Sequence, residues 1–194
     1  MPAESASALW TLTFRGDYSD KPFAVSIVTN GGTGARPAQD GLSATSFPSA
    51  VRGTPVEVVE ATTPIVFWRR ELRENSGGEG ATRGGLGQDI EIGTRDASPL
   101  TFIAAFDRVD HPARGRLGGR SGAAGELKVK NGRRLSAKGA HRIEAHERLV
   151  IRTPGGGGYG DPHRRCAVAR AADSSAGYVS EPDARQQCPD SEVF

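Results

Sequence analysis

Residues 30–41 read N-G-G-T-G-A-R-P-A-Q-D-G and directly follow a β-branched and aromatic run. Three glycines fall within four positions, at Gly31, Gly32 and Gly34. Glycine tolerates positive φ and lets another group approach the main chain closely. A strand that breaks into such a loop can cradle an anion or a substrate with its main-chain amides.

Two charged side chains follow these glycines in the same stretch. Arg36 supplies a fork of guanidinium donors, and Asp40 supplies a carboxylate that could orient Arg36 or activate a water molecule. A hairpin or bulge with surface charges would use the same residues, so the two interpretations stay open on this stretch alone.

The composition favours a loop-rich β structure. Glycine accounts for 26 of the 194 residues and the hydrophobic fraction is only 36%, which is unlike a helical bundle. The glycines occur in short clusters between apolar runs, so the composition does not indicate disorder along the whole chain. The length suits one domain or a piece of a larger one.

Charge and cysteine usage favour no nucleic-acid or membrane partner. The net charge is +2, from 25 cations and 23 anions, and acidic residues interrupt the arginine patches. No apolar run approaches the length that spans a bilayer, the first residues do not resemble a secretory leader, and two cysteines form no disulfide framework. We therefore expect a cytoplasmic protein.

Several segments show the alternation or the apolar runs of strands. The first two, 8–14 and 23–29, predict a hairpin, and Asn131-Gly132 indicates a type I′ turn. The other expected strands are 65–72, 88–94, 99–106, 127–130 and 149–152. The predicted fold class is α+β and β-rich, with mixed or antiparallel sheets, long glycine-rich loops and a short helical C-terminal tail.

Helix signals are confined to two places. Residues 54–61 fit either a strand or a short helix that Thr54 and Glu57 would cap. In the tail, Asp161 as N-cap and Pro162 as first helical residue predict a helix over 163–172. Gly177 could end that helix, and Ser180 with Asp183 predicts a final short helix before the end frays.

Two further candidates lie outside the first glycine loop. Glu57 and Glu60 could share a helix face as an acid–base pair, although a cap residue beside a solvated one fits as well. Arg70 could hold an anionic group if it turns inward, or lie at a solvated strand end.

Common catalytic motifs are missing from the sequence. The chain has no Gly-Lys dipeptide and hence no Walker phosphate loop, and Pro37 stands at the third glycine position of a dinucleotide fingerprint. The four histidines show no HExxH or other recognised ligand spacing, so no metal ligands are predicted.

Several strings together resemble the hydantoinase B/5-oxoprolinase family, and within it bacterial N-methylhydantoinase B subunits most. In addition to residues 30–41 they are S-F-P-S-A-V-R-G-T-P-V-E-V-V-E, R-R-E-L-R-E-N-S-G-G-E-G, R-G-G-L-G-Q, G-R-L-G-G-R-S-G and T-P-G-G-G-G-Y-G-D-P. They occur in the order and approximate spacing of that family, between residues 2 and 161. The resemblance therefore divides the chain into 1–161, the C-terminal part of a family domain, and 162–194, a short helical and partly disordered tail.

The resemblance implies a function in ring opening. Family members work with a hydantoinase A-type subunit that uses ATP to phosphorylate a cyclic amide oxygen, after which the B-type part hydrolyses the activated intermediate. ATP is thus expected at the partner, with no cofactor on this chain. We assign Arg36, Asp40 and Glu57 as catalytic candidates and Gly31, Gly32, Gly34 and Arg70 as binders of the substrate or its phosphate.

The same resemblance covers only the C-terminal part of the longer family members. The His/Asp-rich N-terminal half, which is thought to hold a divalent metal in relatives, has no counterpart in this sequence. We therefore expect a truncated product or one part of a split subunit, inactive alone and partnered by that half. Alternatives are a non-catalytic assembly fragment and a part of an acetone-carboxylase-like subunit.

Overall fold

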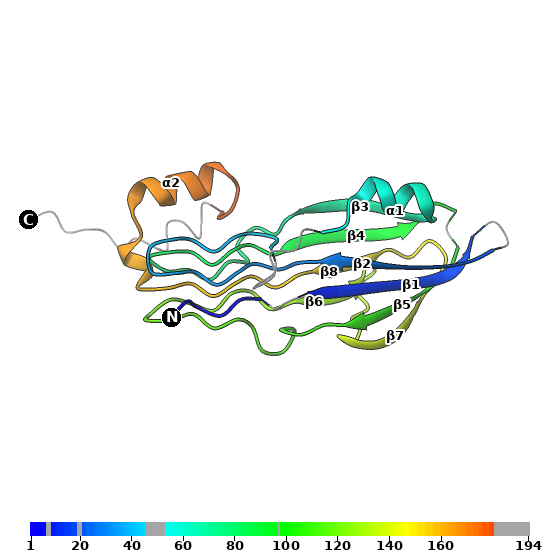
Figure 1. Ribbon diagram of the computed structural model, residues 1–194, viewed down its shortest axis with the longest axis horizontal. Helices are drawn as coiled ribbons and strands as arrows, with labels where there is room; N and C mark the ends of the chain where they lie inside the picture. The colour runs from blue at the N-terminus through cyan, green and yellow to red at the C-terminus, as the bar shows by residue number, and fades with distance from the viewer. Residues whose placement is uncertain (7–8, 19–20, 46–52, 97, 181–194) are drawn as a thin grey trace, which may run out of the picture.

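The structure is a computed structural model that describes residues 1–6, 9–18, 21–45, 53–96 and 98–180. Two sheets pack against each other at one end of an elongated molecule, and extended segments form the other end (Figure 1). The strands are β1 Trp10–Tyr18, β2 Lys21–Thr29, β3 Ile65–Leu72, β4 Gln88–Thr94, β5 Leu100–Ala105, β6 Glu126–Val129, β7 Lys138–Ile143 and β8 Leu149–Arg152.

Both sheets are antiparallel and have four strands, in the orders β2-β1-β5-β7 and β3-β4-β8-β6. Alternating residues of β1 point inward, so Trp10, Leu12 and Phe14 are fully buried. They meet Ile90 and Ile151 of the other sheet in one hydrophobic core. Apolar burial between the two inner faces stabilises the sandwich.

The extended end is a bundle of segments, most of them glycine-rich, that are neither helix nor β-strand; we call it the glycine bundle. It contains 3–6, 31–45, 76–87, 113–123 and 154–160, which run side by side (Figure 1). Along one segment, three consecutive amides donate to three different neighbouring segments, and the fourth amide donates to the same segment as the first. The amides of Gly155 and Gly158 donate to the carbonyls of Ala123 and Arg120, while Gly156 donates to Gly85. This period is that of a chain with three residues per turn, as in polyproline II.

Glycine is required in the bundle because the backbones touch. A Cβ atom on Gly32 would overlap the carbonyl oxygen of Gly85, and one on Gly156 would overlap that of Thr33. Since side chains are excluded between these segments, main-chain hydrogen bonds hold them together instead of apolar contacts.

Three short helical elements complete the described fold: α1 Val56–Thr62, the 3₁₀ turn η1 Pro162–Arg164 and α2 Ala167–Ser175. Helix α1 packs on β3, and its N-cap is Pro55 without a side-chain hydrogen bond, so the predicted capping box is wrong. Asp161 does cap η1, by accepting from the amide of His163.

The tail helix predicted over 163–172 is broken. Arg165 adopts an extended conformation between η1 and α2, because its side chain turns into the molecule (below). Gly177 ends α2 as predicted, with φ +68 and an amide that donates to Ser174, while Tyr178 donates to Asp173. The final helix that Ser180 is expected to cap would begin at residue 181, outside the described residues.

The β-rich α+β class predicted from the sequence is confirmed, and both sheets are antiparallel. The β1–β2 hairpin pairs Trp10 with Thr29 and Tyr18 with Lys21. Strand β7 was not predicted, since it is mostly exposed and shows no alternation. The turn at Asn131-Gly132 is not type I′, because only Gly132 has positive φ.

Candidate functional site

The amides of the first glycine loop are already used inside the chain. Gly32 donates to the carbonyl of Pro154 at 3.0 Å, and Gly34 donates to the hydroxyl of Ser5 at 3.0 Å. Both residues are buried in the bundle, as is Gly31, whose carbonyl accepts from Thr45. The geometry therefore argues against a cradle of free amides at Gly32 and Gly34, since a bound anion would compete with these bonds.

Arg36 and Asp40 lie near the turn that follows this loop. Arg36 is exposed, its amide donates to the carbonyl of Gln39, and its own carbonyl accepts from Thr82. The carboxylate of Asp40 points away to the tail and binds Arg165. Asp40 therefore does not orient Arg36 in this structure, and the catalytic roles of both residues stay predictions.

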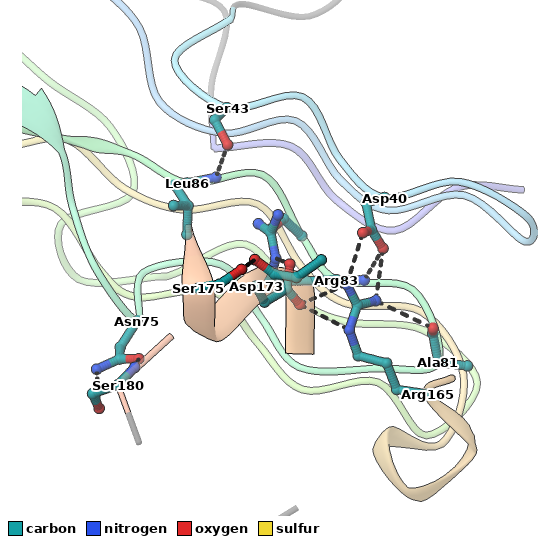
Figure 2. Close-up of polar contacts among 12 residues, drawn as sticks. Asp40, Ser43, Asn75, Ala81, Arg83, Leu86, Arg165, Asp173, Ser175 and Ser180 are labelled. Carbon is teal, nitrogen blue, oxygen red and sulfur yellow. Dashed lines mark hydrogen bonds and ion pairs between the residues drawn. The ribbon is translucent and has the colours of Figure 1, made fainter. Parts of the chain in front are cut away.

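Asp40 belongs to a cluster of two arginines and two aspartates, which we call the tail clasp (Figure 2). Both terminal nitrogens of Arg165 bind the Asp40 carboxylate at 2.8 Å, and its Nε binds Asp173 at 2.9 Å. The other oxygen of Asp173 meets Nε of Arg83 at 3.3 Å. The clasp thus joins the loop at Asp40, the bundle segment 76–87 and helix α2.

The clasp is electrically balanced, and both of its arginines are largely closed to water, whereas Asp40 is partly exposed. The side chains of Arg165 and Arg83 are only 5% and 7% exposed. Burial raises the pKa of Asp40, but hydrogen bonds from Arg165 and from the amide of Arg83 outweigh it and leave the pKa lowered. Burial likewise lowers the pKa of Arg165, yet its bonds to Asp40 raise it overall. Asp40 and Arg165 thus stabilise each other's charged forms, and the clasp acts as a structural tie between its segments.

Glu57 of α1 and Arg70 of β3 belong to the sandwich, whereas the 36–39 turn belongs to the glycine bundle (Figure 1). Arg70 donates to the carbonyl of Thr54 at 2.7 Å, and its guanidinium lies 5.9 Å from the ring centroid of Phe67. Burial lowers the pKa of Arg70, which the charge of Glu57 partly opposes. The structure does not bring this pair to Arg36 or Asp40, and its role in binding stays a prediction.

A cleft of about 1030 Å³ opens where the bundle meets the sandwich, which we call the junction cleft. It is lined by the loop 106–111 after β5, by 124–127 at the start of β6, by 134–138 before β7, and by Arg73 and Arg152. Its size is that of a small-molecule site. The sequence interpretation did not single out this region, although Arg73 belongs to the R-R-E-L-R string.

Two features are absent from the residues that the structure describes. In that part of the chain, no group of three or more His, Cys, Asp or Glu side chains is arranged to hold a metal ion. The same residues contain no helix that is both long and apolar enough to cross a membrane.

This fold of a two-sheet sandwich continued by a glycine bundle defines the class of the protein. Residues 1–162 match the family described as Hydantoinase B/oxoprolinase, and the chain belongs to that family. It is 38% identical over 148 residues to 5-oxoprolinase 1 of Arabidopsis thaliana, covering 74% of this chain and 12% of that protein. It is 31% identical over 169 residues to caprolactamase subunit beta of Pseudomonas jessenii, covering 79% of this chain and 28% of that one.

Solved structures share the fold. An ATP-dependent caprolactamase from Pseudomonas jessenii matches with a TM-score of 0.77 and 24% identity, over 95% of this chain and 34% of that one. A nucleotide-free acetone carboxylase matches with a TM-score of 0.73 and 23% identity, over 95% of this chain and 30% of that one. The chain thus spans about a third or less of the length of each of these four proteins.

Proposed function

We propose that this chain is the hydantoinase-B-type component of an ATP-dependent enzyme that opens a cyclic amide. The observation that carries the proposal is the family match over residues 1–162, which includes the whole sandwich and glycine bundle. The names 5-oxoprolinase and caprolactamase, given to two relatives, indicate enzymes that act on cyclic amides. The second relative is named as a subunit, subunit beta.

The chemistry needs a second component that consumes ATP. An amide carbon is a poor electrophile, and phosphorylation of its oxygen makes it open to attack by water. Because this sequence has no Walker phosphate loop, we assign phosphorylation to an A-type subunit. This chain would then help to bind the negatively charged intermediate and the carboxylate formed when the ring opens.

Co-expression tests this proposal. The chain, an A-type subunit and the N-terminal part of a B-type protein would be purified together and given hydantoin, 5-oxoproline or caprolactam with ATP. We expect ring opening and ADP release that both disappear when this chain is omitted. Equal turnover without the chain would contradict the proposal.

A carboxylating enzyme is the second candidate, because the fold is shared with acetone carboxylase. The same purified complex would be supplied with bicarbonate and acetone. Carboxylate formation that depends on bicarbonate, without ring opening, would favour a carboxylating enzyme over a cyclic amide hydrolase.

A further inference from the structure

The junction cleft contains a half-buried cation that lacks a carboxylate of its own. Arg73 is half-buried, and its Nη1 donates to the carbonyls of Ala124, at 2.7 Å, and Thr153, at 3.4 Å. Among the described residues, no acidic side chain forms an ion pair with it. Buried charges are costly unless they are paired, so an unpaired guanidinium at a cleft wall favours an anionic ligand.

The acidic groups nearest to Arg73 are held by another arginine. Asp89 lies 3.2 Å from Nε of Arg152, and Glu126 accepts from Nη1 of Arg152 at 3.1 Å. Burial lowers the pKa of Arg73 and so does the neighbouring Arg152, while Asp89 and Glu126 oppose them. Two guanidinium groups thus lie close together at one wall of the cleft.

The charged residues that line the cleft are mostly cationic, although Arg108 among them is paired with Glu4. Five cationic residues line it against three acidic ones, Asp107, Asp110 and Glu126. Asp107 pairs with Lys138 at 3.4 Å at the exposed rim, and Glu126 also binds Lys128. The balance of charge in the cleft therefore favours an anion.

The floor of the cleft is apolar and closely packed. Phe106 and Leu127 line it and are buried, and Phe106 stacks on Trp10 with ring centroids 4.1 Å apart. A Cβ atom on Gly125 would overlap the indole of Trp10, so glycine at this position lets the main chain of the cleft pack directly on that ring. An apolar floor beside a cationic wall fits a small organic molecule with one anionic group.

We propose that the junction cleft binds a small organic anion, with its carboxylate or phosphoryl group at Arg73 and its apolar part on Phe106 and Leu127. The choice of ligand rests on the proposed function, because ring opening yields a carboxylate and activation yields a phosphorylated amide. The site for the anion is thereby placed away from Gly32 and Gly34, whose amides are occupied.

Trp10 provides a probe beneath this floor. The chain has two tryptophans, so a Trp68→Phe variant would report on Trp10 alone. The full chain would be titrated with N-carbamoylglycine, with inorganic phosphate and with uncharged hydantoin. We expect a saturable fluorescence change with at least one anion and a much weaker one with hydantoin. Binding of N-carbamoylglycine would identify a product site, and binding of phosphate a site for the activated intermediate. No change with either anion up to about 10 mM would overturn the proposal.

Variants locate the binding. Arg73→Gln should lower the affinity for the anion about tenfold or more, since it removes a charge-assisted pair. Arg73→Lys should lose less affinity. Arg116→Gln is the matched control, because Arg116 is exposed on the glycine bundle and does not line the cleft. Equal affinity of a folded Arg73→Gln variant and the unaltered chain would contradict the assignment.

A measurement on the unaltered chain covers the case in which Arg73→Gln does not fold. Amide chemical shifts would be followed during the titration, and changes should concentrate at 106–111 and 124–127. Changes centred on 31–35 would overturn the proposal. These experiments need neither ATP nor a partner, so binding without turnover in the co-expressed complex would refute only the proposed function.

Discussion

At the scale of single residues, a methyl group on Gly156 would overlap the carbonyl oxygen of Thr33 from a neighbouring segment. The amide of Gly156 donates to Gly85 on a different segment. One residue therefore touches two other parts of the bundle through its backbone alone. The glycines of this region act as packing residues, in the place that apolar side chains take in the sandwich.

Gly156→Ala should lower the free energy of unfolding by about 3 kcal/mol or more, because the rigid backbone around it cannot make room. Gly132→Ala is the control: it lies in a turn with nothing within 4 Å, and only its φ of +99 opposes a side chain. Gly132→Ala should lower the free energy of unfolding by only about 1 kcal/mol. Urea unfolding of both variants gives the comparison, and equal losses would count against close packing in the bundle.

Glu4 ties the first bundle segment to the segment around Arg114. Its carboxylate accepts from Nε of Arg114 at 2.9 Å, from the Arg114 amide at 3.1 Å and from Arg108 at 3.0 Å. The hydrogen bond from the Arg114 side chain is the main reason that the pKa of Glu4 is lowered to about 2. A lowered pKa means that the unfolded chain binds the proton first as the pH falls.

The stabilisation by Glu4 should therefore be complete above pH 4.5 and disappear as the pH falls to about 2. Because Arg114 is exposed and water screens the pair, we expect a contribution of about 1 kcal/mol. Between these pH values, the free energy of unfolding should fall less steeply with decreasing pH in Glu4→Gln than in the unaltered chain. Glu74→Gln, an exposed change, is the control, and parallel curves for all three proteins would argue against the tie.

At the scale of elements, the tail clasp decides where helix α2 lies. The extended backbone at Arg165 lets its side chain reach both Asp40 and Asp173, at the cost of a continuous helix. Further along, the amide and carboxamide groups of Asn75 bind Tyr178 and Ser180, which fixes the chain beyond α2 (Figure 2). The tail is therefore part of the bundle's surface and not a loose extension over its described length.

Asp173→Ala should detach helix α2, because it leaves Arg83 and Arg165 buried with one carboxylate between them. Loss of one partner from a buried ion pair costs about 3–5 kcal/mol. Hydrogen exchange of the amides in α2 should become much faster, while that of β1 and β8 changes little. Val168→Ala serves as the control on the same helix, since Val168 is 76% exposed. Slow exchange of α2 in Asp173→Ala would contradict a clasp that holds the helix.

Local patterns predicted most strands but not the bundle. Strand β4 alternates Ile90 and Ile92 with polar residues, and its predicted bounds are those observed. Strand β7 pairs with β5 through its backbone although its side chains are mostly exposed, so no hydrophobic pattern marks it. The clasp and the glycine contacts join residues far apart in the sequence, for example Asp40 and Arg165. Such long-range contacts leave no local signal, so the sequence predicts either an anion cradle or a hairpin at 30–41 and not a packed bundle.

At the scale of the whole molecule, the two ends have different kinds of core. The sandwich is stabilised by buried apolar side chains, and the bundle by main-chain hydrogen bonds between glycine-rich segments. The junction cleft lies between them and combines the apolar floor of one with the cations near the other. The glycines thus build the frame of the bundle, and the binding of an organic anion that we propose falls to side chains at the junction.

Amide hydrogen exchange of Gly32, Gly34, Gly156 and Gly157, with and without phosphate, tests this account most directly. The account predicts slow exchange at all four, comparable to that of β8, since each amide donates within the chain, and no change in rate or chemical shift when phosphate is added. Rapid exchange in the free chain, together with protection by phosphate, would show that these amides are free to bind an anion, and this result would contradict the role of the glycines as packing residues.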